Sequence, residues 1–171
     1  MENIENELNK IEVSDLLTSN DDIDKIQNYD LTVEIIGFID GMESSRIVGN
    51  NQQYKLFKFY LNNESGRRVQ VVAWNDEIDR ILVHVRPNYI IHLDGVQARP
   101  PKVSAFNNGT TNFELLIKSH NQINNLGEYK PQQNFEDNPQ LIKMTDLYNS
   151  LSQRDNRVNY KMINSEFSKQ N

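Results

Sequence analysis

The feature that most constrains this 171-residue chain is the order of its apolar segments, which cluster between about Leu31 and Ile123. Alternation of β-branched and aromatic residues with polar residues predicts five strands, at 31–39, 54–61, 68–74, 89–98 and 112–117. Ile78, Ile81 and Leu82 recur at helical spacing and predict one short helix between the third and fourth strands. Asn75 is expected to be the N-cap of this helix.

A helix, at 76–83, between the third and fourth of five strands is the arrangement of an OB fold, a small closed barrel. Long polar segments at 40–53 and 99–111 correspond to the two loops that carry binding surfaces on such barrels. A sandwich needs more strands and a doubly wound fold needs more helices. The expected fold is therefore all-β, a five-stranded OB-fold barrel with one short helix between strands 3 and 4, plus a C-terminal helix.

The predicted hairpin of strands 54–61 and 68–74 divides into two faces. One face is entirely apolar and is expected to point into the barrel: Phe57, Phe59, Leu61, Val69, Val71 and Ala73. Trp74 and Tyr60 are left on the outer face, beside Lys58 and Gln70. Large aromatics among polar side chains on an outer face favour a binding surface, although Trp74 would equally pack under a loop.

Composition shifts divide the chain into four regions: an acidic N-terminal lead-in at 1–29, the barrel at 30–123, an Asn/Gln/Pro-rich linker at 124–138, and a C-terminal helix and polar tail at 139–171. The C-terminal helix carries an apolar stripe formed by Leu141, Met144, Leu147, Tyr148 and Leu151. This stripe is expected either to pack on its own barrel or to associate with a protein partner or a second copy.

The formal net charge of −6 comes entirely from the lead-in, because residues 1–29 hold eight acidic and two basic side chains. The rest of the chain is balanced, so the acidic total does not exclude nucleic acid as a partner. The lead-in itself is a candidate to occupy a basic groove of the barrel.

Several kinds of chemistry are excluded or disfavoured by the sequence. The absence of cysteine excludes a disulfide scaffold, a cysteine zinc site and a thiol nucleophile. The three histidines, His84, His92 and His120, have no metal-binding spacing, and no phosphate-binding glycine loop or serine-nucleophile motif occurs. The polar N-terminus is not a signal peptide, and no apolar run reaches the length of a membrane span. We therefore expect no enzymatic activity, no metal, no cofactor, no membrane and no secretion.

Short motifs in the hairpin and helix match a known family in register. They are Lys55-Leu56-Phe57, Asn63-Glu64-Ser65-Gly66, Val72-Ala73-Trp74-Asn75-Asp76 and Ile78-Asp79-Arg80, followed farther on by Asn88-Tyr89-Ile90-Ile91, Gly95 and Asn112-Phe113-Glu114-Leu115. Over about residues 11–125 the sequence resembles the first high-affinity single-stranded-DNA-binding domain of the replication protein A large subunit. The chain differs from that family in having one barrel, no zinc ribbon and Gln70 where a basic residue is usual.

The resemblance implies which residues bind nucleic acid. Trp74 and Phe106 would stack on bases, and Lys55, Gln70 and Asp76 would make polar contacts. In the first loop, Arg46, Asn50 and Asn51 are candidates. Tyr60 is a further candidate on the outer face. The charge pattern adds possible phosphate contacts from five cationic side chains: Arg46, Lys55, Lys58, Arg99 and Lys102.

The leading hypothesis is single-stranded DNA binding without catalysis, in replication, repair, recombination or telomere maintenance, in the nucleus or wherever the DNA is handled. The alternative is a protein-interaction OB-fold subunit that scaffolds a complex, with weak or no nucleic-acid binding. A third hypothesis, an RNA-binding barrel, would show a preference for RNA.

Overall fold

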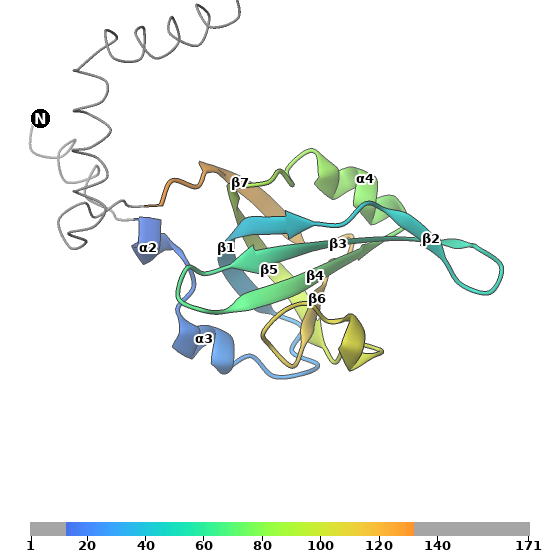
Figure 1. The fold of residues 1–171 in the computed structure, drawn as a ribbon, viewed down its shortest axis with the longest axis horizontal. Helices are drawn as coiled ribbons and strands as arrows, with labels where there is room; N and C mark the ends of the chain where they lie inside the picture. Colours follow the sequence, from blue (N-terminus) through green and yellow to red (C-terminus); the bar gives the residue numbers. More distant parts are fainter. Residues whose placement is uncertain (1–12, 132–171) are drawn as a thin grey trace, which may run out of the picture. The chain divides into compact units, whose positions relative to one another are not determined.

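The computed structural model describes residues 13–131, shown in colour in Figure 1. The elements, in chain order, are α2 (Val13–Leu16), α3 (Asn20–Asp24), β1 (Val33–Met42), β2 (Arg46–Val48), β3 (Tyr54–Asn62), β4 (Arg68–Trp74), α4 (Asp76–Leu82), β5 (Tyr89–Arg99), η1 (Ser104–Phe106), β6 (Glu114–Leu116) and β7 (Gln122–Glu128). Within this part of the chain, no helix has the length and apolar character needed to cross a membrane.

Five of the strands close into a barrel. They follow the order β1-β3-β4-β6-β5, and β5 pairs back onto β1. The β4–β6 pairing is parallel and the other pairings in the barrel are antiparallel. This order and the position of α4 between β4 and β5 confirm the predicted OB fold.

Strand β7 corrects the predicted domain boundary. Both β6 and β7 pair antiparallel with β5, β6 near its end and β7 along its beginning, so together they act as one interrupted strand. The expected linker at 124–138 is therefore wrong for residues 124–128. Asparagine favours loops, but an edge strand tolerates polar side chains facing solvent while Ile123 is buried. The remaining linker residues from 132, and the expected C-terminal helix at 139–171 with its Leu141–Leu151 stripe, lie outside the described residues.

The first long loop is partly strand. Residues 40–42 complete β1, and β2 pairs with the beginning of β3, so the chain forms a narrow hairpin extension between β1 and β3. We call residues 43–53 the finger. Figure 1 shows the tip of the finger projecting away from the barrel at the end where β3 begins.

The barrel interior holds the apolar face predicted for the hairpin. Phe57, Phe59 and Leu61 from β3 and Val69, Val71 and Ala73 from β4 are all buried in one core, which confirms the predicted facing. Ile78 and Ile81 of α4 extend this core, and Ile23 of α3 joins it from the β3–β4 turn side.

Asn75 precedes α4 as predicted but does not cap it with its side chain. Its Oδ1 accepts a hydrogen bond from the backbone N–H of Lys55, at 2.9 Å. Its backbone has a positive φ of 51°, a conformation that asparagine tolerates better than most residues. Asn75 therefore ties the end of β4 to the start of β3.

The described part of the acidic lead-in packs on the barrel. Leu17 and Ile23 are buried, and the amide of Asn63 donates to the carbonyl oxygen of Thr18 at 3.0 Å. Arg67 donates two hydrogen bonds to the Asp24 carboxylate, at 2.7 and 2.6 Å, and these bonds lower the pKa of Asp24. Residues 13–29 therefore belong to the folded domain.

Candidate functional site

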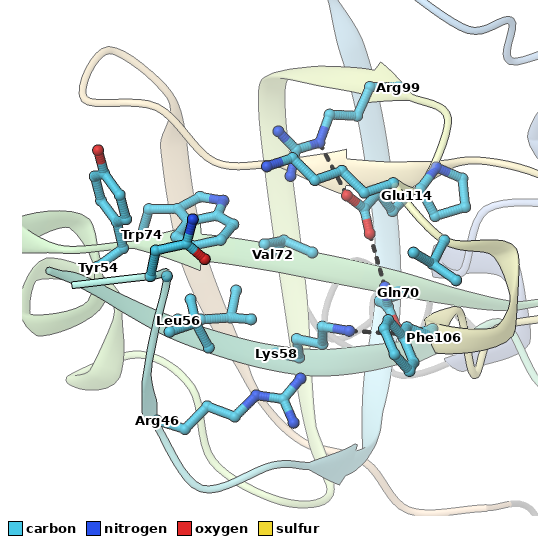
Figure 2. A pocket seen from close by; sticks show the side chains of 16 residues that line it. Arg46, Tyr54, Leu56, Lys58, Gln70, Val72, Trp74, Arg99, Phe106 and Glu114 are labelled. Carbon is cyan, nitrogen blue, oxygen red and sulfur yellow. Dashed lines mark hydrogen bonds and ion pairs between the residues drawn. The ribbon is translucent and has the colours of Figure 1, made fainter. Parts of the chain in front are cut away.

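A groove with a volume of about 460 Å³ crosses the outer face of β3 and β4. The finger forms one wall, and the loop between β5 and β6, residues 100–113, forms the other (Figure 2). We call this second wall the β5–β6 loop. The groove lies where the sequence predicts a binding surface, between the two long loops of the barrel.

The floor of the groove is apolar. Strand alternation turns Leu56 and Val72 outward, and both are covered by the surrounding walls. Leu56 is paired across the ladder with Trp74, and Val72 is paired with Lys58. The lead-in contributes no described residue to this groove, so residues 13–29 do not occupy it.

Aromatic side chains stand at both ends of the floor. Figure 2 shows Trp74 and Tyr54 at one end and Phe106 at the other. Phe106 and Tyr54 are 62% and 51% exposed, and Trp74 is half-buried. The structure therefore brings Trp74 and Phe106 to one groove, 32 positions apart in the sequence.

Tyr54 is a groove residue that the sequence reasoning missed. It lies on the same face of β3 as Leu56, so the alternation that identified Trp74 also identifies Tyr54. Its ring packs beside Gly49 of the finger, where a Cβ atom would lie 3.0 Å from the Tyr54 Cδ2 atom. Tyr54 thus joins the finger to the aromatic end of the floor.

The β5–β6 loop is hydrogen-bonded to the outer face of the hairpin. The Lys58 ammonium donates to the carbonyl oxygen of Phe106, at 3.0 Å. Arg68 donates to the carbonyl oxygen of Asn108 at 2.9 Å, and the Asn108 amide donates to the Tyr60 hydroxyl at 3.1 Å. The loop therefore lies across side chains that the sequence placed on an open surface.

Gln70 is fully buried beneath this loop. Its Nε2 donates to Glu114 at 2.7 Å, and its Oε1 accepts from the Asn108 backbone N–H at 3.3 Å. Arg99 donates to the other Glu114 oxygen at 2.9 Å, which offsets the charge of the buried carboxylate. Both ends of the Gln70 amide and the charge of Arg99 are thus engaged inside the protein, a different role from the predicted contacts with nucleic acid.

Tyr60 is also buried rather than exposed on the outer face. Its hydroxyl donates to the Glu43 carboxylate, and the Arg68 guanidinium lies 4.0 Å from the centre of its ring. Burial raises the pKa of Tyr60, and the bond to Glu43 raises it further. Tyr60 therefore supports the loop instead of lining the groove.

Besides Tyr60, three predicted contact residues lie outside the groove: Lys55, Asp76 and Asn51. Lys55 alternates onto the opposite face of β3 from Leu56, and its ammonium pairs with Asp79 at 3.7 Å. Asp76 is exposed at the start of α4, and Asn51 is exposed in the finger while its neighbour Asn50 lines the groove.

Arg46 and Lys102 supply the available positive charge of the groove. Both are exposed, one on each wall, and neither side chain has an ion-pair or hydrogen-bond partner among residues 13–131. The lining holds four cationic side chains and one carboxylate, Glu114, which is already paired. Over the same described range, no cluster of three or more His, Cys, Asp or Glu side chains is arranged to hold a metal ion.

Comparisons with known proteins agree on the fold. No protein-family model and no curated protein sequence matches the chain. Among solved structures, a replication protein A heterotrimer bound to single-stranded DNA matches 64% of this chain with a TM-score of 0.54 and 20% identity. The matched region spans 27% of that much longer chain.

DNA-binding domain A of Saccharomyces cerevisiae replication protein A matches 64% of this chain and 95% of its own length, with a TM-score of 0.51 and 18% identity. At identities this low, the structural matches establish the fold alone. The chain therefore contains an OB-fold domain like those of replication protein A, as the sequence motifs predict.

Proposed function

We propose that this protein binds single-stranded DNA in the groove between the finger and the β5–β6 loop, without enzymatic activity. The observation that carries the proposal is that half-buried Trp74 and exposed Phe106 stand at the two ends of an apolar floor, with Arg46 and Lys102 free on the walls. Two solved structures with this fold come from replication protein A, and one of them is bound to single-stranded DNA.

Stacking supplies most of the proposed binding energy. Unpaired bases stack on Trp74, Tyr54 and Phe106, each contributing about 1–3 kcal/mol with little dependence on base identity. Arg46 and Lys102 pair with phosphates and add a modest salt dependence. One barrel with this many contacts holds about three to five nucleotides.

From the likeness to replication protein A, we further propose a role in DNA replication, repair, recombination or telomere maintenance. The protein would act in the nucleus or wherever the DNA is handled. The apolar stripe from Leu141 to Leu151 is proposed to recruit a protein partner or a second copy, which would raise the affinity through additional linked sites.

The test is binding of fluorescently labelled oligo-dT, followed by anisotropy. Loss of two stacking rings in a Trp74→Ala, Phe106→Ala double variant is expected to weaken binding about a hundredfold or more. Tyr29→Ala is the matched control, because Tyr29 is 69% exposed but lies outside the groove.

Unchanged affinity of the double variant would contradict stacking in this groove. In the wild-type protein, oligo-dT should also quench the fluorescence of Trp74, the single tryptophan of the chain. No binding to oligo-dT at low salt, with stable co-purification of a partner, would favour a protein-interaction subunit. Stronger binding to oligo-U than to oligo-dT would favour an RNA-binding barrel.

A further inference from the structure

Lys58 lies on the groove side of β3, but its charged end is directed to the protein. The side chain is only 7% exposed, and its Nζ atom lies 3.0 Å from the carbonyl oxygen of Phe106. A buried ammonium group requires a hydrogen-bond acceptor, and the backbone of the β5–β6 loop supplies it (Figure 2). Lys58 therefore holds the Phe106 backbone while the Phe106 ring stays largely exposed.

Gln70 holds the same loop two residues farther on. Its Oε1 accepts from the Asn108 backbone N–H, and its Nε2 is fixed by Glu114 of β6. The Glu114 carboxylate is in turn fixed by Arg99. A chain of hydrogen bonds thus runs from β5 through β6 and β4 to Asn108 of the β5–β6 loop.

The segment around these two anchors, residues 104–111, is closed by its own hydrogen bonds. The Asn107 backbone N–H donates to the Ser104 carbonyl at 3.1 Å, and the Asn107 side chain donates to the Thr111 carbonyl at 2.8 Å. Gly109 donates its backbone N–H to the Asn107 side-chain oxygen at 2.9 Å. The loop has a defined internal shape that Lys58 and Gln70 fasten to the barrel.

We infer that Lys58 and Gln70 are positioning residues, which hold the Phe106 ring in place before any nucleic acid arrives, and that neither contacts the ligand. The identity of the ligand in this inference rests on the proposed function. The claim that the two residues hold the loop does not depend on it. A prepositioned ring loses less conformational freedom on binding than a ring on a free loop, so the two residues raise affinity without touching DNA. The ammonium of Lys58 then contributes nothing to the salt dependence of binding.

The test replaces Lys58 by methionine, which keeps much of the volume and removes the hydrogen-bond donor. Lys55→Met is the matched control, because Lys55 lies on the same strand but faces α4 and Asp79. Lys102→Met serves as the reference for a direct phosphate contact. Amide hydrogen exchange is measured by NMR in the free protein, and oligo-dT affinity is measured over a series of salt concentrations.

The backbone N–H groups of Phe106, Asn107 and Thr110 all donate hydrogen bonds in the free protein. In Lys58→Met, exchange at these three amides is expected to accelerate about tenfold or more, while the strands keep their protection. Affinity is expected to fall about three- to tenfold with an unchanged salt slope. Lys102→Met is expected to lower that slope by about 0.7, and Lys55→Met to leave both measurements unchanged.

Unchanged loop exchange together with a slope lowered by about 0.7 in Lys58→Met would overturn the inference and make Lys58 a phosphate contact. If Lys58→Met fails to fold, Gln70→Met removes the acceptor of the Asn108 backbone N–H and keeps a similar volume, while Arg99 stays paired with Glu114. Loop exchange that stays unchanged in that variant also overturns the inference. If the wild-type protein binds no oligo-dT, the proposed function fails, and the exchange measurement still decides whether the loop is held.

Discussion

The two walls of the groove are built in different ways. The β5–β6 loop is held by side chains from beneath, namely Lys58, Gln70, Arg68 and Tyr60. The finger is held by the short β2–β3 ladder and, at its first residue, by the bonds of Glu43 to Tyr60 and to the Lys58 carbonyl oxygen. Ile47 of the finger is 63% exposed. A wall with many anchors is expected to be preformed, and a wall with few anchors to open and close locally.

This difference suggests that the two walls of the groove have different roles in binding. The β5–β6 loop presents Phe106 at a fixed position on the barrel. The finger, which carries Arg46 and packs Gly49 beside Tyr54, is expected to adjust to the strand that lies on the floor.

Arg68→Ala should have the largest effect, because Arg68 joins three parts of the structure. Its guanidinium bonds Asp40 at 2.8 and 2.9 Å, bonds the Asn108 carbonyl and lies over the Tyr60 ring. Removing it should lower the free energy of unfolding by about 2–3 kcal/mol, measured by urea denaturation.

Arg67→Ala is the control for this variant, since Arg67 precedes Arg68 but pairs with Asp24 of α3 at the surface. Its effect should be clearly smaller, as is usual for exposed ion pairs. Equal losses for the two arginines would contradict a strongly anchored β5–β6 loop.

A pair of glycine substitutions compares the two walls directly. A Cβ atom at Gly109 would lie 2.6 Å from the backbone oxygen of Arg68, so Gly109→Ala must displace the β5–β6 loop and should cost about 1–3 kcal/mol. At Gly49, which has a φ of +100°, the nearest atoms belong to the exposed side chain of Tyr54, which is free to swing aside.

Gly49→Ala should therefore cost only the backbone strain, about 1 kcal/mol, with changes confined to the finger. Urea denaturation gives the free energies of unfolding, and amide chemical shifts show where each structure changes. Loop-wide shifts from Gly49→Ala, or none from Gly109→Ala, would reverse the comparison.

Alkaline pH should loosen the finger at its first residue, Glu43, which accepts the hydrogen bond of the Tyr60 hydroxyl. The pKa of Tyr60 is raised above its ordinary value of 10.0, mainly by burial and also by Glu43, so folding favours the neutral phenol. The stability contributed by that phenol is complete below pH 10 and is lost as the pH rises through the folded-state pKa. The free energy of unfolding should therefore fall above pH 10. The fall should be less steep in Tyr60→Phe. At neutral pH this substitution should itself lower the free energy of unfolding by about 1 kcal/mol.

Tyr129 must be controlled in this experiment, because burial raises its pKa to about 12, with a further contribution from Glu64. Its stabilising contribution is lost in the same direction, between pH 10 and about 12. Urea denaturation of Tyr60→Phe, Tyr129→Phe and the double variant from pH 8 to 11 separates the two groups. An alkaline decline that is identical with and without the Tyr60 hydroxyl would contradict the role assigned to Tyr60.

The smallest effects are expected from the free cations, one on each wall. Arg46→Ala and Lys102→Ala should each lower the slope of log affinity against log salt by about 0.7 and leave stability nearly unchanged. Arg86→Ala, an exposed cation outside the groove, is the control. A slope change for Lys102 but not for Arg46 would mean that the finger does not close on the bound strand.

Local pattern identified most of the barrel. Side-chain alternation has a period of two residues, so Phe57, Phe59 and Val71 could be assigned to the core from their neighbours alone. Strand β7 escaped detection because its asparagines resemble a loop, and its pairing partner lies about 30 residues earlier in β5. Asn75 was placed correctly, but the partner of its side chain, Lys55, lies 20 residues away.

The candidate site divides in the same way. The motif resemblance predicted Trp74 and Phe106 as site residues, and both line the groove. Strand alternation could also have identified Tyr54. Lys55 and Asp76 were carried over from the same resemblance, but the face of β3 and the start of α4 place them outside the groove.

Neighbouring residues were enough to locate the strands of the hairpin and the face that points inward, and the motif resemblance added Trp74 and Phe106. What the outward polar residues do depends on the tertiary structure. The β5–β6 loop folds back over Lys58 and Gln70 from 48 and 38 residues away and turns both into internal hydrogen-bond partners. Alternation specifies the face on which a side chain lies, whereas its exposure depends on what the rest of the chain lays over that face.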